Sequence, residues 1–355
     1  MKRSSLVSLA VVASATALVL SACSNSGGNS NAGSENKASS KTACVILPDA
    51  ASSPRWENMD RPDLKQALQG AGFKVNIQNA QGDTGKYATI ADQELSQGCG
   101  VMLLVDFNGA GVSVAKKAKS QGIPVIAYDR PIAGADYYVS FDNEKVGELE
   151  GQAVVEGLKA EGKDPASATV VYMGGDPTDG NAKMFHDGAD KVMSDAGIKP
   201  AKEPPGIWDG AKSATNFEQA LTALGGHVDA VWAANDTNAA GVISVLDKNG
   251  LKVPISGQDA STEGLQNVLL GKQTGTVWKH VPDEAKAASD LAIKLLKGEK
   301  PNVSKKLDDG TPYIAVTPVL VGPKDVEKVV QAGDATVSDL CTGAVAAACT
   351  QYGVK

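Results

Sequence analysis

Charged, amide and aromatic side chains recur in this chain just after apolar runs of strand length. When the chain is read as repeated strand-then-helix units, these post-strand residues are Arg55-Trp56, Asp129-Arg130, Asn181, Asn235-Asp236, Asp259 and Lys279. In parallel α/β sheets, ligands bind in the crevice outside the carboxyl ends of the strands. The pattern therefore predicts a polar cleft for a small neutral molecule rich in hydroxyl groups, such as a sugar.

A sugar ring has an apolar C–H face and a belt of hydroxyls, so its site needs flat aromatics as well as charged or amide groups. Trp56 and Trp208 are the predicted stacking pair, because aromatic residues make up only 5% of the chain and Trp56 lies in a polar loop. Core or loop packing stays open for Trp208. Trp232, inside an apolar strand, and Trp278 are predicted to pack.

A glycoside hydrolase is the first alternative, since paired aspartates in a cleft could serve one. Here the aspartates lie among Arg, Lys and Asn, which keep carboxylates ionised instead of raising one pKa for general acid catalysis. The sequence also lacks Gly-x-Ser-x-Gly, Gly-x-Gly-x-x-Gly and His-Glu-x-x-His. We therefore predict binding without catalysis and without a cofactor.

The elements that must position these residues alternate along the chain. The strands predicted in the first half are Ala43 to Leu47, Val75 to Gln78, Val101 to Val105 and Pro124 to Tyr128. Several are apolar throughout, as parallel strands buried on both faces should be. The second half repeats the scheme with strands Thr169 to Met173, Ala230 to Ala233 and Val253 to Ser256, and helices near 144–160, 181–196, 213–224, 237–249 and 282–297. Two doubly wound α/β halves predict two lobes around a cleft, with a join near Val139-Ser140-Phe141.

The first residues predict export. Lys2 and Arg3 precede an apolar run from Leu6 to Leu20, which is too short for a comfortable membrane span and reads as a signal peptide over residues 1–22. The ending Leu-Ser-Ala-Cys looks like a lipobox in which Cys23 is lipidated; a plain signal cleaved near Ala22 is the alternative. Residues 23–41 contain almost nothing apolar and predict a flexible tether. About 310 residues then remain, which favours two domains.

Charge and cysteine usage narrow the function further. A net charge of -7 and a pI of about 5.1 argue against a nucleic-acid surface. Without Cys23, an even number of cysteines remains for disulfides, Cys44, Cys99, Cys341 and Cys349. Cys44 opens the first strand and Cys99 precedes the third, and these strands are neighbours in a flavodoxin-like order, so we pair Cys44 with Cys99 and Cys341 with Cys349. No Cys-x-x-Cys is present and the three His are scattered, which disfavours a metal site.

Several ordered motifs resemble one family. The strongest stretch runs from Ala127-Tyr128-Asp129-Arg130 through Tyr138 to Leu149, and further matches are Met173-Gly174-Gly175, Asn181-Ala182-Lys183, Asn235-Asp236, Ile255 to Ala260 and Gln273-Thr274. With these motifs the chain resembles the type I periplasmic sugar-binding proteins of ABC importers, and most closely their D-xylose-binding branch. The resemblance covers residues from Val45 to about Val330.

The resemblance implies a fold and a ligand set. It implies two parallel-sheet lobes joined by three crossovers, near Ser140, His280 and Thr317, so that the N-terminal lobe is 42–140 plus 281–316 and the C-terminal lobe 141–280 plus 317–355. The sugar ligands that it implies are Arg55, Asp129, Arg130, Asn143, Asn181, Asn235, Asp236, Asp259 and Lys279, and it places a Trp where Trp208 stands. For Asn143, and for Asp236, capping of the helix that follows is the alternative. Asp259 and Lys279 could also form an ordinary ion pair.

The resemblance also implies partners. Lobes that close on a monosaccharide, with xylose favoured, would dock on the membrane subunits of an ABC importer, and the family habit favours a monomer. Glucose, arabinose, ribose and galactose stay open as ligands, as does a chemoreceptor as partner. A transcriptional regulator of this fold would carry a helix-turn-helix head in place of an export signal. The lipobox predicts an anchor on the outer face of the cytoplasmic membrane, or a lipid-anchored periplasmic protein.

Overall fold

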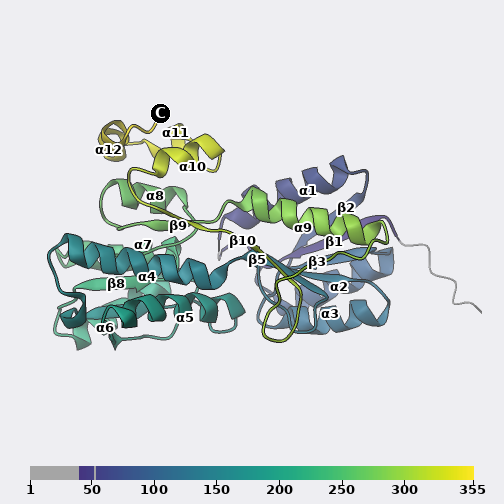
Figure 1. Ribbon diagram of the computed structural model, residues 1–355, viewed down its shortest axis with the longest axis horizontal. Helices are drawn as coiled ribbons and strands as arrows, with labels where there is room; N and C mark the ends of the chain where they lie inside the picture. Colours follow the sequence, from purple (N-terminus) through teal and green to yellow (C-terminus); the bar gives the residue numbers. More distant parts are fainter. Residues whose placement is uncertain (1–39, 52) are drawn as a thin grey trace, which may run out of the picture. The chain divides into compact units, whose positions relative to one another are not determined.

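The computed structural model describes residues 40–51 and 53–355, so that Cys23, the signal peptide and almost all of the predicted tether lie outside the described residues. Within the described part, a six-stranded sheet has the order β10-β5-β4-β3-β1-β2 and a three-stranded sheet has the order β7-β6-β8. We call them the first and the second sheet. All paired strands in both sheets are parallel (Figure 1). The predicted α/β architecture with parallel sheets is confirmed.

The first sheet is covered by helices on both faces, and its inner strands, including β1, β3 and β4, are buried. Its strands are β1 (Thr42–Leu47), β2 (Lys74–Asn79), β3 (Val101–Leu104), β4 (Val125–Tyr128), β5 (Tyr137–Phe141) and β10 (Tyr313–Val316). Its helices are η1 (Trp56–Asp60), α1 (Arg61–Gly70), α2 (Thr84–Gln97), α3 (Ala110–Ser120) and α9 (Val281–Leu296). Along β1, Val45 and Leu47 join an apolar cluster with α1 and α9, whereas Cys44 and Ile46 join a cluster with α2 and α3. Because successive side chains in a strand point to opposite faces, a strand covered on both sides must be apolar throughout.

The strand order explains the first disulfide. The order β2-β1-β3-β4-β5 is the predicted flavodoxin-like one, with β10 added beside β5. Because β1 pairs with β3, residues at the starts of these strands lie close together, and Cys44 is joined to Cys99 with a Cα–Cα distance of 5.8 Å. This is the pairing that the sequence predicts.

The second sheet follows the same plan. Its strands are β6 (Val170–Met173), β7 (Pro200–Lys202) and β8 (Ala230–Ala233). The helices after it in the chain or beside it are α4 (Asn143–Ala160), η2 (Pro165–Ser167), α5 (Gly180–Asp195), α6 (Gly210–Ala223), α7 (Asp236–Lys248) and α8 (Thr262–Leu269). Figure 1 shows α4 and α5 running side by side. Their close packing depends on Gly147, because a side chain there would place its Cβ 1.9 Å from the carbonyl oxygen of Phe185.

The predicted strand from Val253 to Ser256 is wrong as a full strand. The structure retains only an isolated parallel bridge between Val231 and Ile255. Pro254 has no backbone N–H to donate to a ladder. The contact with Ala233 is made by the Ser256 side chain. Its hydroxyl oxygen accepts from the backbone N–H of Ala233 at 2.8 Å, and the hydroxyl donates to the Ala233 carbonyl at 3.1 Å.

Three short segments connect the first sheet and its helices to the rest of the described chain, which includes a separate two-stranded sheet of β9 (Thr276–Trp278) and β11 (Val319–Val321). The chain leaves β5 of the first sheet at Phe141 and enters α4 directly, and it passes from β9 through His280 into α9. After β10 it continues into β11, which pairs antiparallel with β9. These connections lie near Ser140, His280 and Thr317, where the resemblance places the three crossovers, and the division into lobes stays a prediction.

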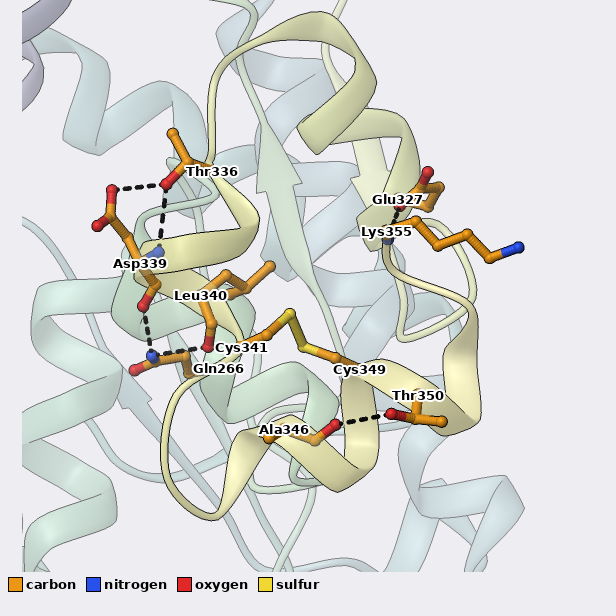
Figure 2. The surroundings of a disulfide bond; sticks show 10 residues. All are labelled: Gln266, Glu327, Thr336, Asp339, Leu340, Cys341, Ala346, Cys349, Thr350 and Lys355. Carbon is orange, nitrogen blue, oxygen red and sulfur yellow. Dashed lines mark hydrogen bonds between the residues drawn. A yellow bond between two sulfur atoms is a disulfide. The ribbon is translucent and has the colours of Figure 1, made fainter.

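The last residues form a small core of their own. The helices α10 (Val326–Ala332), α11 (Val337–Leu340) and α12 (Val345–Tyr352) share an apolar cluster with α8. Figure 2 shows the predicted disulfide between Cys341 and Cys349, and Gln266 donating to the carbonyl oxygens of Asp339 and Leu340 at 3.2 and 3.0 Å. The disulfide and these bonds fasten α11 and α12 to α8. Over the described residues, none of the helices combines the length and the apolar character that crossing a bilayer requires.

Candidate functional site

Residues from loops at the carboxyl ends of strands in both sheets enclose one small cavity. Its lining residues are Ser53, Arg55, Trp56, Asp129, Arg130, Asp179, Asn181, Phe185, Trp208, Asn235, Gln258, Asp259 and Lys279. All the predicted ligand residues except Asn143 and Asp236 therefore line it. We call it the inner cavity. Its volume is about 30 Å³.

Arg55 is held by carboxylates from three parts of the chain. Its guanidinium lies 2.8 Å from Asp60 Oδ1 and 2.9 Å from Asp129 Oδ2, and it also pairs with Glu284 in the first turn of α9. Burial lowers the pKa of Arg55, but Asp60, Glu284 and Asp129 raise it by more, so the net pKa is well above its ordinary value. Arg55 therefore stays charged and ties the loop after β1 to the end of β4 and to α9.

The carboxyl groups around Arg55 outnumber their cation, so one of them must hold a proton or find another donor. Burial raises the pKa of Glu284 well above its ordinary value, although Arg55 opposes the shift. Asp60 also accepts a hydrogen bond from the Tyr128 hydroxyl. Arg55, a predicted ligand, therefore also holds three carboxyl groups of the fold together.

Arg130 connects the two sides of the inner cavity. It follows β4 of the first sheet, and its Nε lies 3.1 Å from Oδ2 of Asp179, which precedes α5 beside the second sheet. Its Nη1 donates to the backbone carbonyl of Asp106 at 3.1 Å. Burial raises the pKa of Asp179 although Arg130 lowers it. This ion pair spans the cavity wall.

Asp259 and Lys279 form the equivalent pair on the other side. Lys279 Nζ lies 2.9 Å from Asp259 Oδ1, and the side chains are only 8% and 15% exposed. Burial lowers the pKa of Lys279, but Asp259 and Asp129 raise it by more, so the net shift is upward and the ammonium keeps its proton. The ion pair that the sequence offered as an alternative is present, and it faces the cavity.

Asp129 and Asp259 share an unusual backbone conformation. Their φ angles are 61° and 98°, in a region that L residues rarely adopt. Both backbone N–H groups continue a strand pairing, with Asp129 N donating to Val139 O and Asp259 N to Val277 O. Strained residues held in place by their surroundings cluster at functional sites, because the strain turns a side chain toward a ligand.

Asn181 and Asn143 belong to one buried network. Asn181 Nδ2 donates to the carbonyl oxygen of Asp129 at 2.8 Å, and its Oδ1 accepts from the Tyr138 hydroxyl and from Asn143 Nδ2 at 2.7 and 3.0 Å. Asn143 therefore orients Asn181 instead of lining the cavity. It stands in the first turn of α4, after the N-cap residue Asp142, whose side chain makes no capping hydrogen bond.

Asn235 caps a helix as well as lining the inner cavity, whereas Asp236 neither lines the cavity nor caps the helix that follows it. The N-cap of α7 is Asn235, whose Oδ1 accepts from the backbone N–H of Asn238 at 2.8 Å. The buried Asp236 accepts from the backbone N–H of Ser261, the N-cap residue of α8, and from Gln273 Nε2, at 2.9 and 3.0 Å. Asp236 thus fastens α8 behind the inner cavity and does not cap α7.

The tryptophans occupy distinct environments. Trp56 is only 3% exposed, and the guanidinium carbons of Arg55 and Arg130 lie 4.6 and 5.5 Å from its ring centroid. Trp208 is half-buried, donates from Nε1 to Asp179 at 3.1 Å and contacts Phe185 edge-on. Trp232 is core, as predicted, and donates to the buried Glu150 at 2.7 Å. Trp278 packs and donates to Asp334, also at 2.7 Å.

A glycine makes room for Trp208. A Cβ on Gly175, in the loop after β6, would lie 2.0 Å from the Trp208 ring. Only glycine permits the ring to lie there, so the Met173-Gly174-Gly175 motif has a direct effect on the cavity wall.

Six residues around the inner cavity were not singled out from the sequence: Ser53, Asp60, Asp179, Phe185, Gln258 and Glu284. Asp179 and Phe185 lie close to Asn181 in sequence. Asp179 is two residues before it, at the N-cap of α5, and Phe185 is one helical turn after it, so inspection of the neighbours of Asn181 would have found both. Gln258 stands directly before Asp259. Asp60 and Glu284 carry no local signal, because only the fold brings them to Arg55.

A metal is not indicated by the described residues. One group there, Cys44, Glu94 and Cys99, has its ligand atoms close enough to hold an ion. Its sulfurs are joined in a disulfide, so they offer no thiolate. Burial raises the pKa of Glu94 to about 8, which favours its neutral form.

We expect ionisation of Asp236 to lower the stability of the folded protein as the pH rises. Burial raises the pKa of Asp236 to about 7, against 3.8 for an ordinary aspartate, so the folded chain keeps a proton that the unfolded chain releases. This contribution is complete below about pH 4 and is lost as the pH rises through 7, with a slope of at most about 1.4 kcal/mol per pH unit. Urea unfolding between pH 4.5 and 7.5 measures it.

Asp236→Asn should flatten that slope, because an amide does not titrate in this range. Asp247→Asn, which changes an exposed carboxylate paired with Lys272, is the matched control. Equal slopes in the wild type and in Asp236→Asn would contradict the assignment.

The chain is similar to known proteins over most of its length. Residues 44–300 match the family described as periplasmic binding protein domain. The chain is 36% identical over 289 residues to a D-xylose-binding periplasmic protein of Escherichia coli K12, covering 78% of this chain and 85% of that protein. It is 33% identical over 321 residues to a multiple sugar-binding periplasmic receptor of Rhizobium radiobacter, covering 82% and 90%. A solute-binding protein of Clostridium phytofermentans with bound β-D-glucose superposes with a TM-score of 0.76 at 26% identity, covering 84% of this chain and 99% of that one.

Proposed function

Because the chain belongs to the periplasmic binding protein family, as a sugar-binding protein of ABC transporters with the type I fold, we propose that its own ligand is a monosaccharide, with D-xylose favoured. The proteins that it matches are binding proteins of transport systems and not enzymes, so the hydrolase alternative is set aside. The same comparison supports delivery of the sugar to the membrane subunits of an importer.

One observation carries the proposal. Ion pairs from both sides, Arg55 with Asp129 and Lys279 with Asp259, converge on one buried cavity. Paired charges avoid the cost of an isolated buried ion, and they leave oxygen and nitrogen atoms for the hydroxyls of a neutral ligand. Hydrogen bonds from hydroxyls to charged groups are about twice as strong as neutral ones, and Arg and Asp can each contact two neighbouring oxygens.

The mechanism that we infer is closure of two lobes. The lobes are residues 42–140 plus 281–316 and residues 141–280 plus 317–355, and the three crossover segments serve as the hinge. Opening breaks contacts such as the Arg130–Asp179 pair and enlarges the inner cavity; the sugar then stabilises the closed form by its difference in affinity for the two states. A wrong epimer leaves buried polar groups unpaired and binds less well.

The preference for xylose rests on the relatives. Proteins named for D-xylose are 36% identical to the chain in both Escherichia coli and Haemophilus influenzae. Glucose, arabinose, ribose and galactose are the alternatives, since a receptor for multiple sugars is 33% identical. Trp56 and Trp208 are the proposed stacking residues, with Trp56 available to the sugar as the cavity opens.

We further propose that Cys23 is lipidated and holds the protein on the outer face of the cytoplasmic membrane through the tether at 23–41. The Leu-Ser-Ala-Cys ending supports this. Bacterial lipoproteins carry several acyl chains, which a stable anchor requires. The intact mass of the mature protein, extracted from membranes, tests the modification.

Calorimetric titration of residues 42–355 with D-xylose, glucose, arabinose, ribose and galactose tests the ligand. Tight one-to-one binding of xylose alone is the expected result. Tight binding of another sugar would retain the mechanism and replace the ligand. No heat with any of the five would overturn the monosaccharide proposal.

A further inference from the structure

A second and larger cavity lies directly outside the inner one. It has a volume of about 520 Å³, within the usual range for small-molecule sites. We call it the outer cavity. Three residues line both cavities, Arg130, Asp179 and Trp208. The two spaces are therefore neighbours divided by one thin wall of side chains.

A single carboxylate oxygen holds this wall together. Oδ2 of Asp179 receives both the Arg130 guanidinium and the Trp208 indole N–H, each at 3.1 Å. Arg130 follows a strand of the first sheet, whereas the other two residues lie beside the second sheet. A ligand atom that accepts from Arg130 or Trp208 in place of Asp179 would open a passage between the cavities.

The outer cavity offers the same kinds of groups as the inner one. Phe107 and Trp208 supply aromatic rings, and Asp49, Asp106 and Asp209 supply carboxylates. Aromatic rings accept the C–H face of a sugar and carboxylates accept its hydroxyls. Aspartates outnumber the two cations of the lining, Arg130 and Lys212, so the net charge disfavours phosphate or uronate groups.

Residues from both sides also close the outer cavity. The Thr178 hydroxyl, in the loop after β6, donates to Asn108 Oδ1, in the loop after β3, at 3.0 Å. The outer cavity is consequently formed by the same approach of the two sides that forms the inner one. Its occupant would contribute to closure in the same way.

We propose that the outer cavity is a second sugar subsite, so that the protein binds a neutral disaccharide or short oligosaccharide with one unit in each cavity. This inference rests on the proposed function, and it widens the ligand class from monosaccharides to short glycosides. Phe107 is the residue assigned to the outer unit alone, since it lines the outer cavity and not the inner one.

Calorimetry with matched pairs of sugars tests the inference. Xylose is compared with β-1,4-xylobiose, and glucose with cellobiose and maltose, on the wild type and on Phe107→Leu. Leucine keeps the apolar packing of the half-buried Phe107 against its core and removes the ring face. Phe73→Leu, which changes another half-buried phenylalanine packed beside the α1–α9 cluster, is the control.

The expected result is that one disaccharide binds at least as tightly as its monosaccharide. Phe107→Leu should then weaken the disaccharide about 10-fold and leave the monosaccharide unchanged, as loss of one aromatic contact predicts. Monosaccharide binding without disaccharide binding would overturn the inference and retain the proposed function, as would disaccharide binding that is indifferent to Phe107→Leu. Absence of binding to every sugar tested would overturn both the second subsite and the proposed function.

Discussion

Arg55→Ala should lower the free energy of unfolding by about 3–5 kcal/mol and abolish sugar binding. Arg55 is buried and pairs with Asp60, Asp129 and Glu284, so its removal leaves several acid groups in the interior without their cation. Breaking a buried pair by removing one partner costs about this much because the remaining charge stays desolvated. Urea unfolding measures the stability, and calorimetry on the folded fraction measures the affinity.

Arg61→Ala is the matched control. Arg61 also pairs with a carboxylate, Glu57, but both side chains are about one third exposed. Exposed pairs of this kind contribute less than about 1 kcal/mol. Arg55→Lys should fall between wild type and Arg55→Ala, because it keeps the charge and loses the guanidinium fork. Equal destabilisation by Arg55→Ala and Arg61→Ala would contradict the large stability contribution that we assign to the buried ion pairs of Arg55.

Lys279→Met should reduce sugar affinity by a factor of roughly 30 to 5000. Lys279 is buried and Asp259 is only 15% exposed, both beside the inner cavity, and methionine has a similar length but no charge. Truncating one partner of a buried, hydrogen-bonded charge pair costs about 2–5 kcal/mol, since the other charge is left unpaired and the ligand loses a donor. Calorimetric titration with the tightest sugar of the panel measures the change.

Lys272→Met is the control for this prediction. Lys272 also pairs with a carboxylate, Asp247, at 2.7 Å, but both groups are exposed and neither lines the inner cavity. We expect it to leave sugar affinity unchanged. Wild-type affinity in Lys279→Met would show that the Asp259–Lys279 pair is structural and that the sugar contacts other residues.

The sequence predicted best where local pattern and burial coincide. The run Ala43 to Leu47 is apolar throughout because both faces of β1 are covered, and this is visible without coordinates. The polar residues after such strands converge because parallel strands end at one edge. Arg55, Asp129 and Arg130 could be placed near the cavity by that rule alone.

The sequence predicted least where position depends on distant partners. The short strands β9, β10 and β11 have three or four residues, too few for a periodic signal, and they form only by pairing with strands elsewhere in the chain. Asn143 matched a family ligand position, but the fold turns it toward Asn181. Asp236 is held by Ser261 and Gln273, which lie 25 and 37 residues away. Such roles are fixed by tertiary contacts that no window of sequence contains.

The placement of the two disulfides bears on how long the folded protein lasts. Cys44–Cys99 lies within the first sheet and Cys341–Cys349 within the C-terminal helices, so neither bridges the segments proposed as the hinge. Each cross-link restricts the unfolded chain and leaves the proposed opening and closing unrestrained. An oxidising environment would then slow proteolysis and irreversible unfolding without slowing the uptake cycle, so durability and turnover can be adjusted separately.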